Sequence, residues 1–317
     1  MYLPYMYGRQ FELLAIRMML KDERDRGGLL PLIEPLMARP DDLKRCIALC
    51  AKADQSLALV VNPEKHQLKT AAAQQAWLQE FGSTISSSPL VIPTLICRTD
   101  DVRTDVTNFL ASYPDQEVAV VHPGKRLSGA DVQWLGRTST IRWHIVMTDK
   151  VPQARWQQFP VDKLILLRDC FVKQERNADY LGQEFFTDAH HRVPHDAAGI
   201  GDHLCIGSQF KKGGSTPHAV AIHATYVEPE NRDVWVEHFV STDVTKDEGD
   251  VASKFVDAAR KLTRAVHARP TEFGDNRALR EYGQMAKAAA YRGLGINKQL
   301  QMVHHICLMM DVLEGRL

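Results

Sequence analysis

The side chains in this sequence that could do chemistry follow eight short segments rich in Leu, Ile and Val. They include carboxylates, an amide, an imidazole and guanidinium groups, which serve acid–base chemistry and anion binding. In chain order they are Arg9, Gln10, Glu34, Asn62, Arg98, Asp100, His122, Asp149, Arg168, Asp169, Gln209 and Lys211. If the eight segments are parallel strands of one barrel, the carboxyl ends of the strands meet at one face, and these side chains gather there.

The site expected at that face would bind a small anionic ligand carrying a phosphate or carboxylate group. Glu34 and His122 are the candidates for an acid or a base. The candidates for ligand contacts are Arg9, Gln10, Asn62, Arg168 and Lys211. We expect Arg9 to pair with Glu34 until an anion displaces it. Each residue also has a structural interpretation, since Asn-Pro and His-Pro pairs begin turns and Asp100 is placed to cap a helix.

The elements that must position these residues are predicted by the apolar segments and the stretches between them. The segments span 2–7, 29–36, 56–63, 89–98, 117–124, 141–149, 162–169 and 202–210. They lack polar alternation, which is typical of strands that helices cover. Stretches with helical periodicity separate them, at 9–24, 41–53, 71–82, 100–113 and 129–137. The pattern predicts an α/β fold, a (β/α)8 TIM-like barrel. An open doubly wound sheet is the alternative, but no Gly-rich dinucleotide fingerprint follows the first segment.

The pattern changes after the eighth segment. Residues 218–241 alternate as two strands joined by a polar turn, which predicts an antiparallel hairpin inserted after strand eight. Residues 251–268 have helical spacing, and two further helices are expected near 276–291 and 297–313. We therefore expect a barrel over 1–270 that includes the hairpin, and a helical extension over 271–317 packed on it.

The composition narrows the class of protein. The chain has 317 residues, and its 39 Lys and Arg balance 39 Asp and Glu, so no strong direct binding of nucleic acid is expected. No stretch approaches about 20 uninterrupted apolar residues, so no membrane segment is predicted. The six cysteines are scattered through apolar stretches, as reduced thiols are, which predicts a cytoplasmic protein. No motif identifies a cofactor, which stays unknown.

Two further segments have both a chemical and a structural interpretation. His190 and His195, with Asp188 or Asp202, could ligate a metal, but they match no standard zinc motif, and a polar surface loop is favoured. We therefore expect no metal site. The glycine-rich basic stretch 207–218 could cradle phosphate oxygens, although it lacks the order of a P-loop, and a plain loop is an equal alternative.

Several stretches of the chain also resemble the bacterial "beta family" proteins. They are the opening MYLPYMYGRQFELLAIR, the PLIEP strand, IGDH, the hairpin AVAIHATYV and VWVEHFVS, and the closing GLGINKQLQMVHHICLM. The resemblance runs from end to end and is closest to the branch encoded beside a small predicted nuclease in defence or mobile-element loci. It implies a barrel-like fold and a role in antiphage defence. Positions that match family-like motifs are Arg9, Gln10, Glu34, Asp202, His223 and His305, and Asp202 thereby joins the catalytic candidates. His203 departs from the pattern, which has an aromatic there, usually Tyr.

Two functions remain open from the sequence. The first is an enzyme or sensor for a small anionic, nucleotide-like ligand; as an enzyme it would be a hydrolase or lyase that uses Glu34 or His122 as acid or base. The second is a non-catalytic partner of a neighbouring nuclease, with the hairpin and the C-terminal helices as its docking surface. A polar pocket at the strand ends favours the first, and an apolar patch on 276–313 favours the second.

Overall fold

A computed structural model describes residues 1–124, 127–210, 217–245 and 249–317. The chain divides into two compact units: Met1–Asp169 with Ala189–Asp202, and Cys170–Asp188 with His203–Leu317. These bounds differ from the expected division at residue 270. The hairpin and the helix after it belong with the C-terminal helices, because they pack against those helices to build a core of their own. Lys211 lies outside the described residues.

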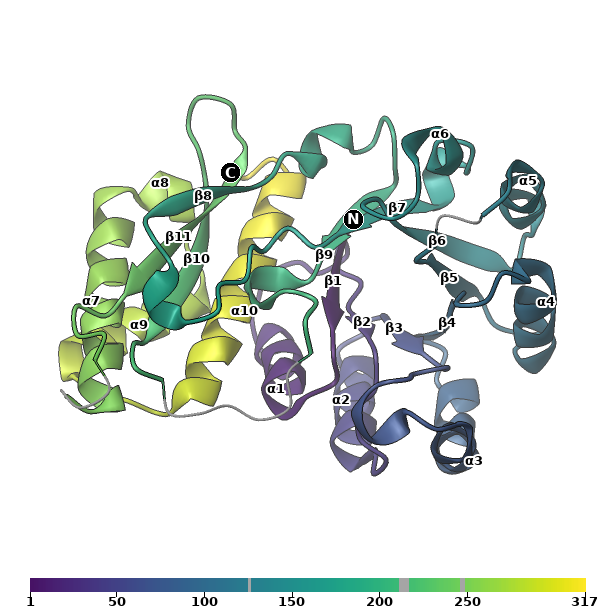
Figure 1. Ribbon diagram of the computed structural model, residues 1–317, viewed down its shortest axis with the longest axis horizontal. Coiled ribbons are helices and arrows are strands. Elements are labelled where there is room, and N and C mark those ends of the chain that lie inside the picture. The colour runs from purple at the N-terminus through teal and green to yellow at the C-terminus, as the bar shows by residue number, and fades with distance from the viewer. Residues whose placement is uncertain (125–126, 211–216, 246–248) are drawn as a thin grey trace. The chain divides into compact units, whose positions relative to one another are not determined.

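The first unit contains a closed parallel barrel of eight strands with helices between them, which confirms the predicted α/β fold (Figure 1). Its strands are almost entirely buried, as expected for apolar segments covered by helices. In barrel order they are β1 (Tyr2–Met6), β2 (Leu32–Ile33), β3 (Leu57–Val60), β4 (Val91–Ile96), β5 (Val118–His122), β6 (Ile141–Met147), β7 (Leu164–Arg168) and β9 (Gly199–Asp202).

Each of the five predicted helices has a counterpart in this unit, although the one expected over 9–24 ends at Met19 and the one expected over 71–82 continues to Ser87. A short helix at Gln153–Trp156 was not predicted. The helices of this unit are α1 (Gln10–Met19), α2 (Asp41–Lys52), α3 (Ala71–Ser87), α4 (Val102–Ser112), α5 (Gly129–Arg137) and α6 (Gln153–Trp156), with short 3₁₀ turns η1 (His66–Leu68), η2 (Val161–Lys163) and η4 (Ala189–Arg192). The residue that caps α4 is Asp101 and not Asp100, since the Asp101 side chain accepts a hydrogen bond from the Thr104 amide.

The eighth barrel strand lies earlier in the chain than expected. It is β9, while the predicted segment 202–210 begins with the last residue of β9 and continues into the 3₁₀ turn η5 (Leu204–Ile206). Glycines explain the difference, because β9 closes the barrel against β1 at very short range. A Cβ atom at Gly199 would lie 2.6 Å from the Met1 carbonyl oxygen, and one at Gly201 would lie 2.4 Å from that of Leu3. The closing strand therefore needs the residues that usually mark turns.

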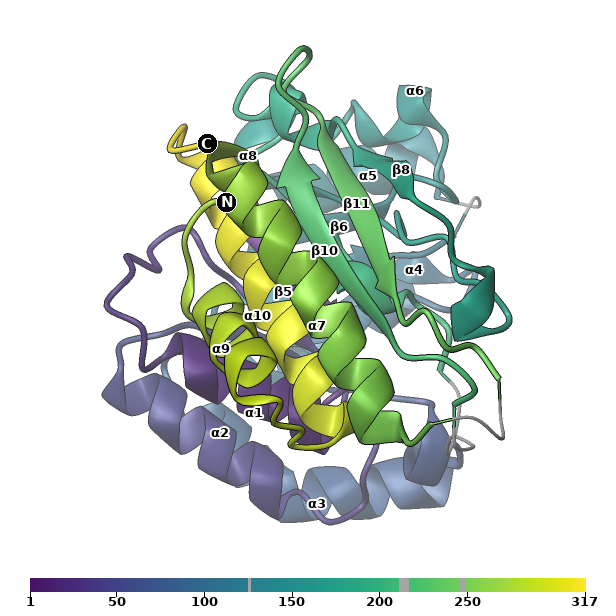
Figure 2. The same ribbon diagram turned by 90° about the vertical axis from the view of Figure 1, so that its left-hand side faces the viewer.

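The second unit is a three-stranded antiparallel sheet with helices (Figure 2). The predicted hairpin is confirmed as β10 (Ala221–Val227) and β11 (Val234–Val240), which pair outside the barrel. A strand that the residue pattern did not predict, β8 (Gln183–Thr187), pairs with β11. The other elements are η3 (Asn177–Asp179), α7 (Val251–Ala268), α8 (Pro270–Phe273), α9 (Arg277–Ala288) and α10 (Leu294–Leu313).

Within the described ranges, no helix combines the length and the apolar character needed to cross a bilayer. All six cysteines are free thiols.

Candidate functional site

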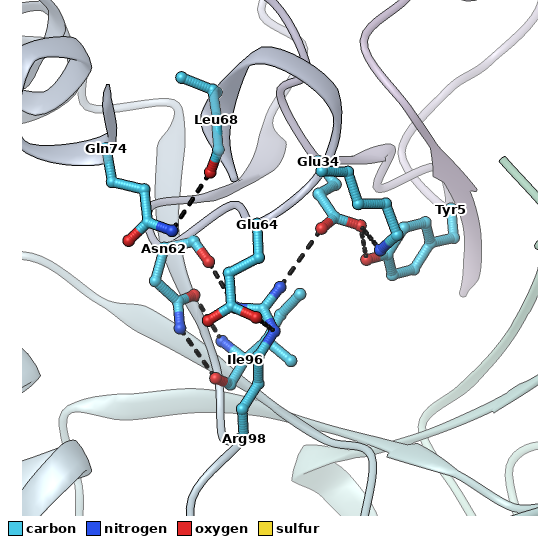
Figure 3. A network of polar contacts seen from close by, with 9 residues as sticks. Tyr5, Glu34, Asn62, Glu64, Leu68, Gln74, Ile96 and Arg98 are labelled. Carbon is cyan, nitrogen blue, oxygen red and sulfur yellow. Dashed lines mark hydrogen bonds and ion pairs between the residues drawn. The ribbon is translucent and has the colours of Figure 1, made fainter. Parts of the chain in front are cut away.

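The carboxylate of Glu34 is the centre of the polar network at the carboxyl ends of the first four strands (Figure 3). Its side chain is fully buried, with 0% exposure. The Tyr5 hydroxyl donates to Oε2 at 2.7 Å, and Lys65 Nζ contacts the same oxygen at 2.6 Å. Arg98 Nη2 reaches Oε1 at 3.3 Å. Both carboxylate oxygens are thus engaged, and a buried negative charge is balanced by two cations.

These groups meet because neighbouring strands of the barrel deliver them. Glu34 follows β2, and its amide donates to the Met6 carbonyl of β1 at 2.8 Å. Lys65 comes from the loop after β3, and Arg98 lies two residues beyond the end of β4. The Lys65 and Arg98 side chains keep 35% and 22% of their surface exposed, so both cations reach solvent from a buried anion.

Arg98 is held by three acceptors. Nη2 contacts Glu34, Nη1 donates to the Asn62 carbonyl, and Nε contacts Glu64 Oε2 at 3.1 Å. The Asn62 side chain in turn bonds both backbone groups of Ile96, each at 2.9 Å. Asn62 therefore ties β3 to β4 and fixes the Arg98 guanidinium, which makes it a positioning residue.

Burial and the nearby charged side chains change the pKa values of two tyrosines, Tyr5 and Tyr7. Burial raises the pKa of Tyr5 well above its ordinary value, and the adjacent Glu34 raises it further. Burial also raises the pKa of Tyr7; the carboxylates of Glu34, Glu12 and Asp169 act in the same direction, and Arg9 opposes them. The Lys65 ammonium lies 5.0 Å from the centre of the Tyr7 ring, a favourable cation–π distance.

A cavity of about 370 Å³ lies beside this network. Arg98, Thr99, Asp100 and His122 are among the residues that line it. Burial lowers the pKa of His122 to about 3, so its imidazole is neutral near pH 7.

His122 also belongs to a buried cluster of rings with His144 and Phe159. Its Nε2 lies 3.3 Å from His144 Nδ1, and the His144 ring stacks on Phe159 with 4.5 Å between centroids. His122 Nδ1 has no hydrogen-bond partner among the described residues. Burial lowers the pKa of His144 as well, and the neighbouring His122 contributes in the same direction.

The remaining predicted site residues are placed differently. Gln10 is the exposed first residue of α1, and Arg9 precedes it, its amide donating to Glu12 Oε2 at 3.3 Å. Arg168 is the exposed last residue of β7. Asp202 ends β9 and accepts a hydrogen bond of 2.8 Å from the Tyr2 hydroxyl.

The expected pairing of Arg9 with Glu34 is wrong. Among the described residues, the cations paired with Glu34 are Lys65 and Arg98, because the loops after β3 and β4 bring them closer to the carboxylate.

No protein-family model and no curated protein sequence matches this chain. The site is therefore interpreted from its own geometry.

His223 and His305, the two histidines that match family-like motifs, belong to the second unit. The two Nδ1 atoms of His223 and His238 lie 2.8 Å apart, and His305 Nδ1 lies 3.0 Å from Thr225 Oγ1. Across the described ranges, no group of three or more His, Cys, Asp or Glu side chains is arranged to hold a metal.

Arg98 is among the predicted strand-end residues, whereas Tyr5, Glu64 and Lys65 were not predicted. Tyr5 lies inside an otherwise apolar strand, and a buried tyrosine needs a partner for its hydroxyl, which was a usable signal. Lys65 and Glu64 follow Asn62 in a loop, where nothing in the residue pattern indicates which charged side chain turns inward.

Proposed function

We propose that the first unit binds a small molecule carrying a phosphate or carboxylate group, recognised by Arg98. The position of Arg98 carries this proposal, because the guanidinium is held against the buried Glu34 and also lines the cavity of about 370 Å³. Small-molecule sites typically enclose about 300–1,000 Å³, so the space suits a ligand of modest size.

Glu64 is the group that the ligand would replace. Its side chain is 51% exposed, in contrast to the fully buried Glu34 on the same guanidinium. Exposed ion pairs contribute about 0–1 kcal/mol, so little stability is lost when Glu64 leaves Arg98. A planar guanidinium can then offer parallel N–H groups to a phosphate or carboxylate.

The other end of the ligand should carry hydrogen-bond donors. Asp100 lines the same cavity and is exposed, so its carboxylate repels an anion and attracts hydroxyl or amino groups. The cavity therefore favours a molecule with one anionic end and one donor-rich end, such as a phosphorylated sugar or nucleoside.

The observations favour binding over turnover. Both oxygens of Glu34 are engaged by donors, and His122 is a neutral group whose lowered pKa makes it a weak base. The His122 imidazole is therefore not poised to accept a proton at neutral pH. The resemblance to the beta family, the defence role, the nuclease partner and the cytoplasmic location stay predictions.

Thermal unfolding with matched ligand pairs tests the proposal. The pairs are glucose 6-phosphate with glucose and adenosine monophosphate with adenosine, each at millimolar concentration. We expect at least one anionic member to raise the unfolding midpoint, because a ligand at about 100 times its Kd stabilises by about 2.7 kcal/mol. The neutral member should have a much smaller effect.

Three variants assign the effect to the site. Arg98→Ala should abolish the shift, while Arg103→Ala, which removes an exposed arginine paired with Asp131 on α5, should retain it. Glu64→Gln should strengthen binding by about two- to fivefold, since it removes an internal competitor whose ion pair is worth up to about 1 kcal/mol. The proposal is refuted if no anionic member stabilises the protein, or if Arg98→Ala binds as the parent does.

A further inference from the structure

A groove between two helices of the second unit is the feature that the proposed function leaves unused. It runs between α7 and α9, which lie side by side (Figure 2), and encloses about 720 Å³. Its apolar lining includes Leu262 and Val266 from α7 and Leu279 and Ala286 from α9. The stretch from 260 to 267 rises about 10 Å along a helix, so the groove is about two helical turns long.

The rim of the groove is basic on both sides. Arg260 and Arg264 lie on the α7 side, and Arg280 and Lys287 on the α9 side; all four are exposed. One acidic residue, Asp275, is among the described residues that line the groove, and its carboxylate pairs with Arg280 at 2.7 Å. Among the described residues, Arg260, Arg264 and Lys287 have no ion-pair partner. The apolar groove is therefore flanked by cations that the unit itself does not neutralise.

Gly283 is a lining residue that has no side chain to fill the groove. It lies in the interior of α9, where glycine costs about 0.5–1 kcal/mol relative to alanine. A Cβ atom at this position would meet nothing within 4 Å, so no contact inside the protein requires the glycine. A larger side chain at this position would project into the groove, so the glycine keeps it open.

We propose that this groove binds an acidic amphipathic helix of a partner protein. The apolar stripe of such a helix fills the groove, and its flanking Glu and Asp side chains face the cations on both walls. Two alternative occupants fit less well. A second copy of the chain would bring the same basic rims together, which like-charge repulsion disfavours. A membrane surface is flat and cannot enter a concave groove.

A fluorescent peptide of about 18 residues tests the proposal by anisotropy with the full chain. The probe carries Leu at helical i, i+3, i+4 spacing with Glu on the opposite face. One control has the same residues in scrambled order, and another has Lys in place of Glu. We expect the acidic amphipathic probe to bind at least about tenfold more tightly than either control, a difference of about 1.4 kcal/mol.

Gly283→Leu is the decisive variant, because leucine favours the helix while its side chain occupies the groove. We expect a loss of affinity of about tenfold or more without a lower unfolding midpoint. Gly82→Leu is the matched control, since Gly82 is also a helical glycine, in α3, where an added Cβ atom would again meet nothing within 4 Å. It should bind the probe as the parent does. Arg264→Glu should also weaken binding, and the effect of Arg264 should shrink at high salt.

Five results would overturn the proposal, and the first four concern the probes and the oligomeric state. They are equal binding of the scrambled probe, no binding of any probe at 100 µM protein, unchanged affinity in Gly283→Leu, and sedimentation showing a dimer that Gly283→Leu dissociates. The last would assign the groove to a second copy. Binding to phosphatidylserine vesicles that Gly283→Leu abolishes, without binding of the probe, would assign it to a membrane instead. Failure here leaves the anion site of the first unit unaffected, because the two proposals share no residue.

Discussion

The two carboxylates on Arg98 offer a direct measurement of how burial changes the value of an ion pair. Glu34→Gln and Glu64→Gln make the same chemical change beside the same guanidinium, but the side chains are 0% and 51% exposed. In Glu34→Gln, an NH₂ group replaces one of the two carboxylate oxygens and faces hydrogen-bond donors in either orientation. In place of Oε2 it would face Tyr5 and Lys65, and in place of Oε1 it would face Arg98. Two cations thereby lose their buried counter-charge.

The expected cost follows from the exposure of the cations. Removing one partner of a fully buried pair costs about 3–5 kcal/mol, and a hydrogen bond to a charged group contributes about 1.5–3 kcal/mol. Lys65 and Arg98 are 35% and 22% exposed, so water reaches both, which favours the lower end. We expect Glu34→Gln to lower the free energy of unfolding by about 2–3 kcal/mol, and Glu64→Gln by less than about 1 kcal/mol.

Urea unfolding followed by tryptophan fluorescence is the assay. Four of the five tryptophans, at 77, 134, 143 and 156, lie in the first unit, so the signal reports mainly the unit that holds Glu34. With a slope of about 2 kcal/mol per molar urea, Glu34→Gln should lower the midpoint by about 1–1.5 M. Midpoints for the two variants that agree within about 0.2 M would refute the reasoning, since burial would then not distinguish the carboxylates.

Three other predictions concern the same unit. Burial lowers the pKa of His122 to about 3, below its value of about 6.5 in the unfolded state. As the pH falls from 6.5 towards 3, the unfolded state therefore binds a proton that the folded state does not, and the free energy of unfolding decreases. Between pH 7 and pH 5, protonation of His122 in the unfolded state lowers the free energy of unfolding by about 2 kcal/mol. His122→Leu should remove this loss, so urea unfolding should depend less on pH in the variant. An unchanged pH dependence would contradict the prediction. Burial raises the pKa of Cys97 to about 12, so its thiol should not react with iodoacetamide at pH 7.5 in the folded protein. Mass spectrometry should find Cys97 unmodified until urea unfolds the unit. Rapid labelling of the folded protein would contradict this burial. Arg168→Ala should bind the anion as the parent does, because Arg168 is not among the described residues that line the cavity, and weaker binding in this variant would place it in the site.

The sequence predicts the barrel well because covered parallel strands leave a strong signal. Val118–His122 and Leu164–Arg168 are almost uninterrupted apolar runs, and each lies inside a predicted segment. The signal fails at β9 and β8 for different reasons. The residues that let β9 approach β1 are glycines, which resemble a turn, while β8 lacks an apolar run and its Gln183 and Phe185 are exposed.

The polar network around Glu34 was predicted in outline but not in its pairings. The rule that strand ends converge brought Glu34, Asn62 and Arg98 to one network. It could not predict that Lys65 rather than Arg9 reaches Glu34, because loop conformation decides which cation lies nearest. It also could not separate a positioning amide such as Asn62 from a ligand contact, since the two differ only in what the side chain bonds.

The order of strands in the second unit has a consequence for the chain as it is being synthesised. Gln183 of β8 faces Glu237 of β11, which is 54 positions later. At about 5–20 residues per second, the ribosome needs on the order of 3–10 s to add that interval. Until β11 emerges, the residues Glu184–Phe186, with two adjacent phenylalanines, have no strand to pair with. Nascent chains are therefore exposed to intermolecular strand pairing during this interval, and a chaperone that shields short aromatic segments would protect them.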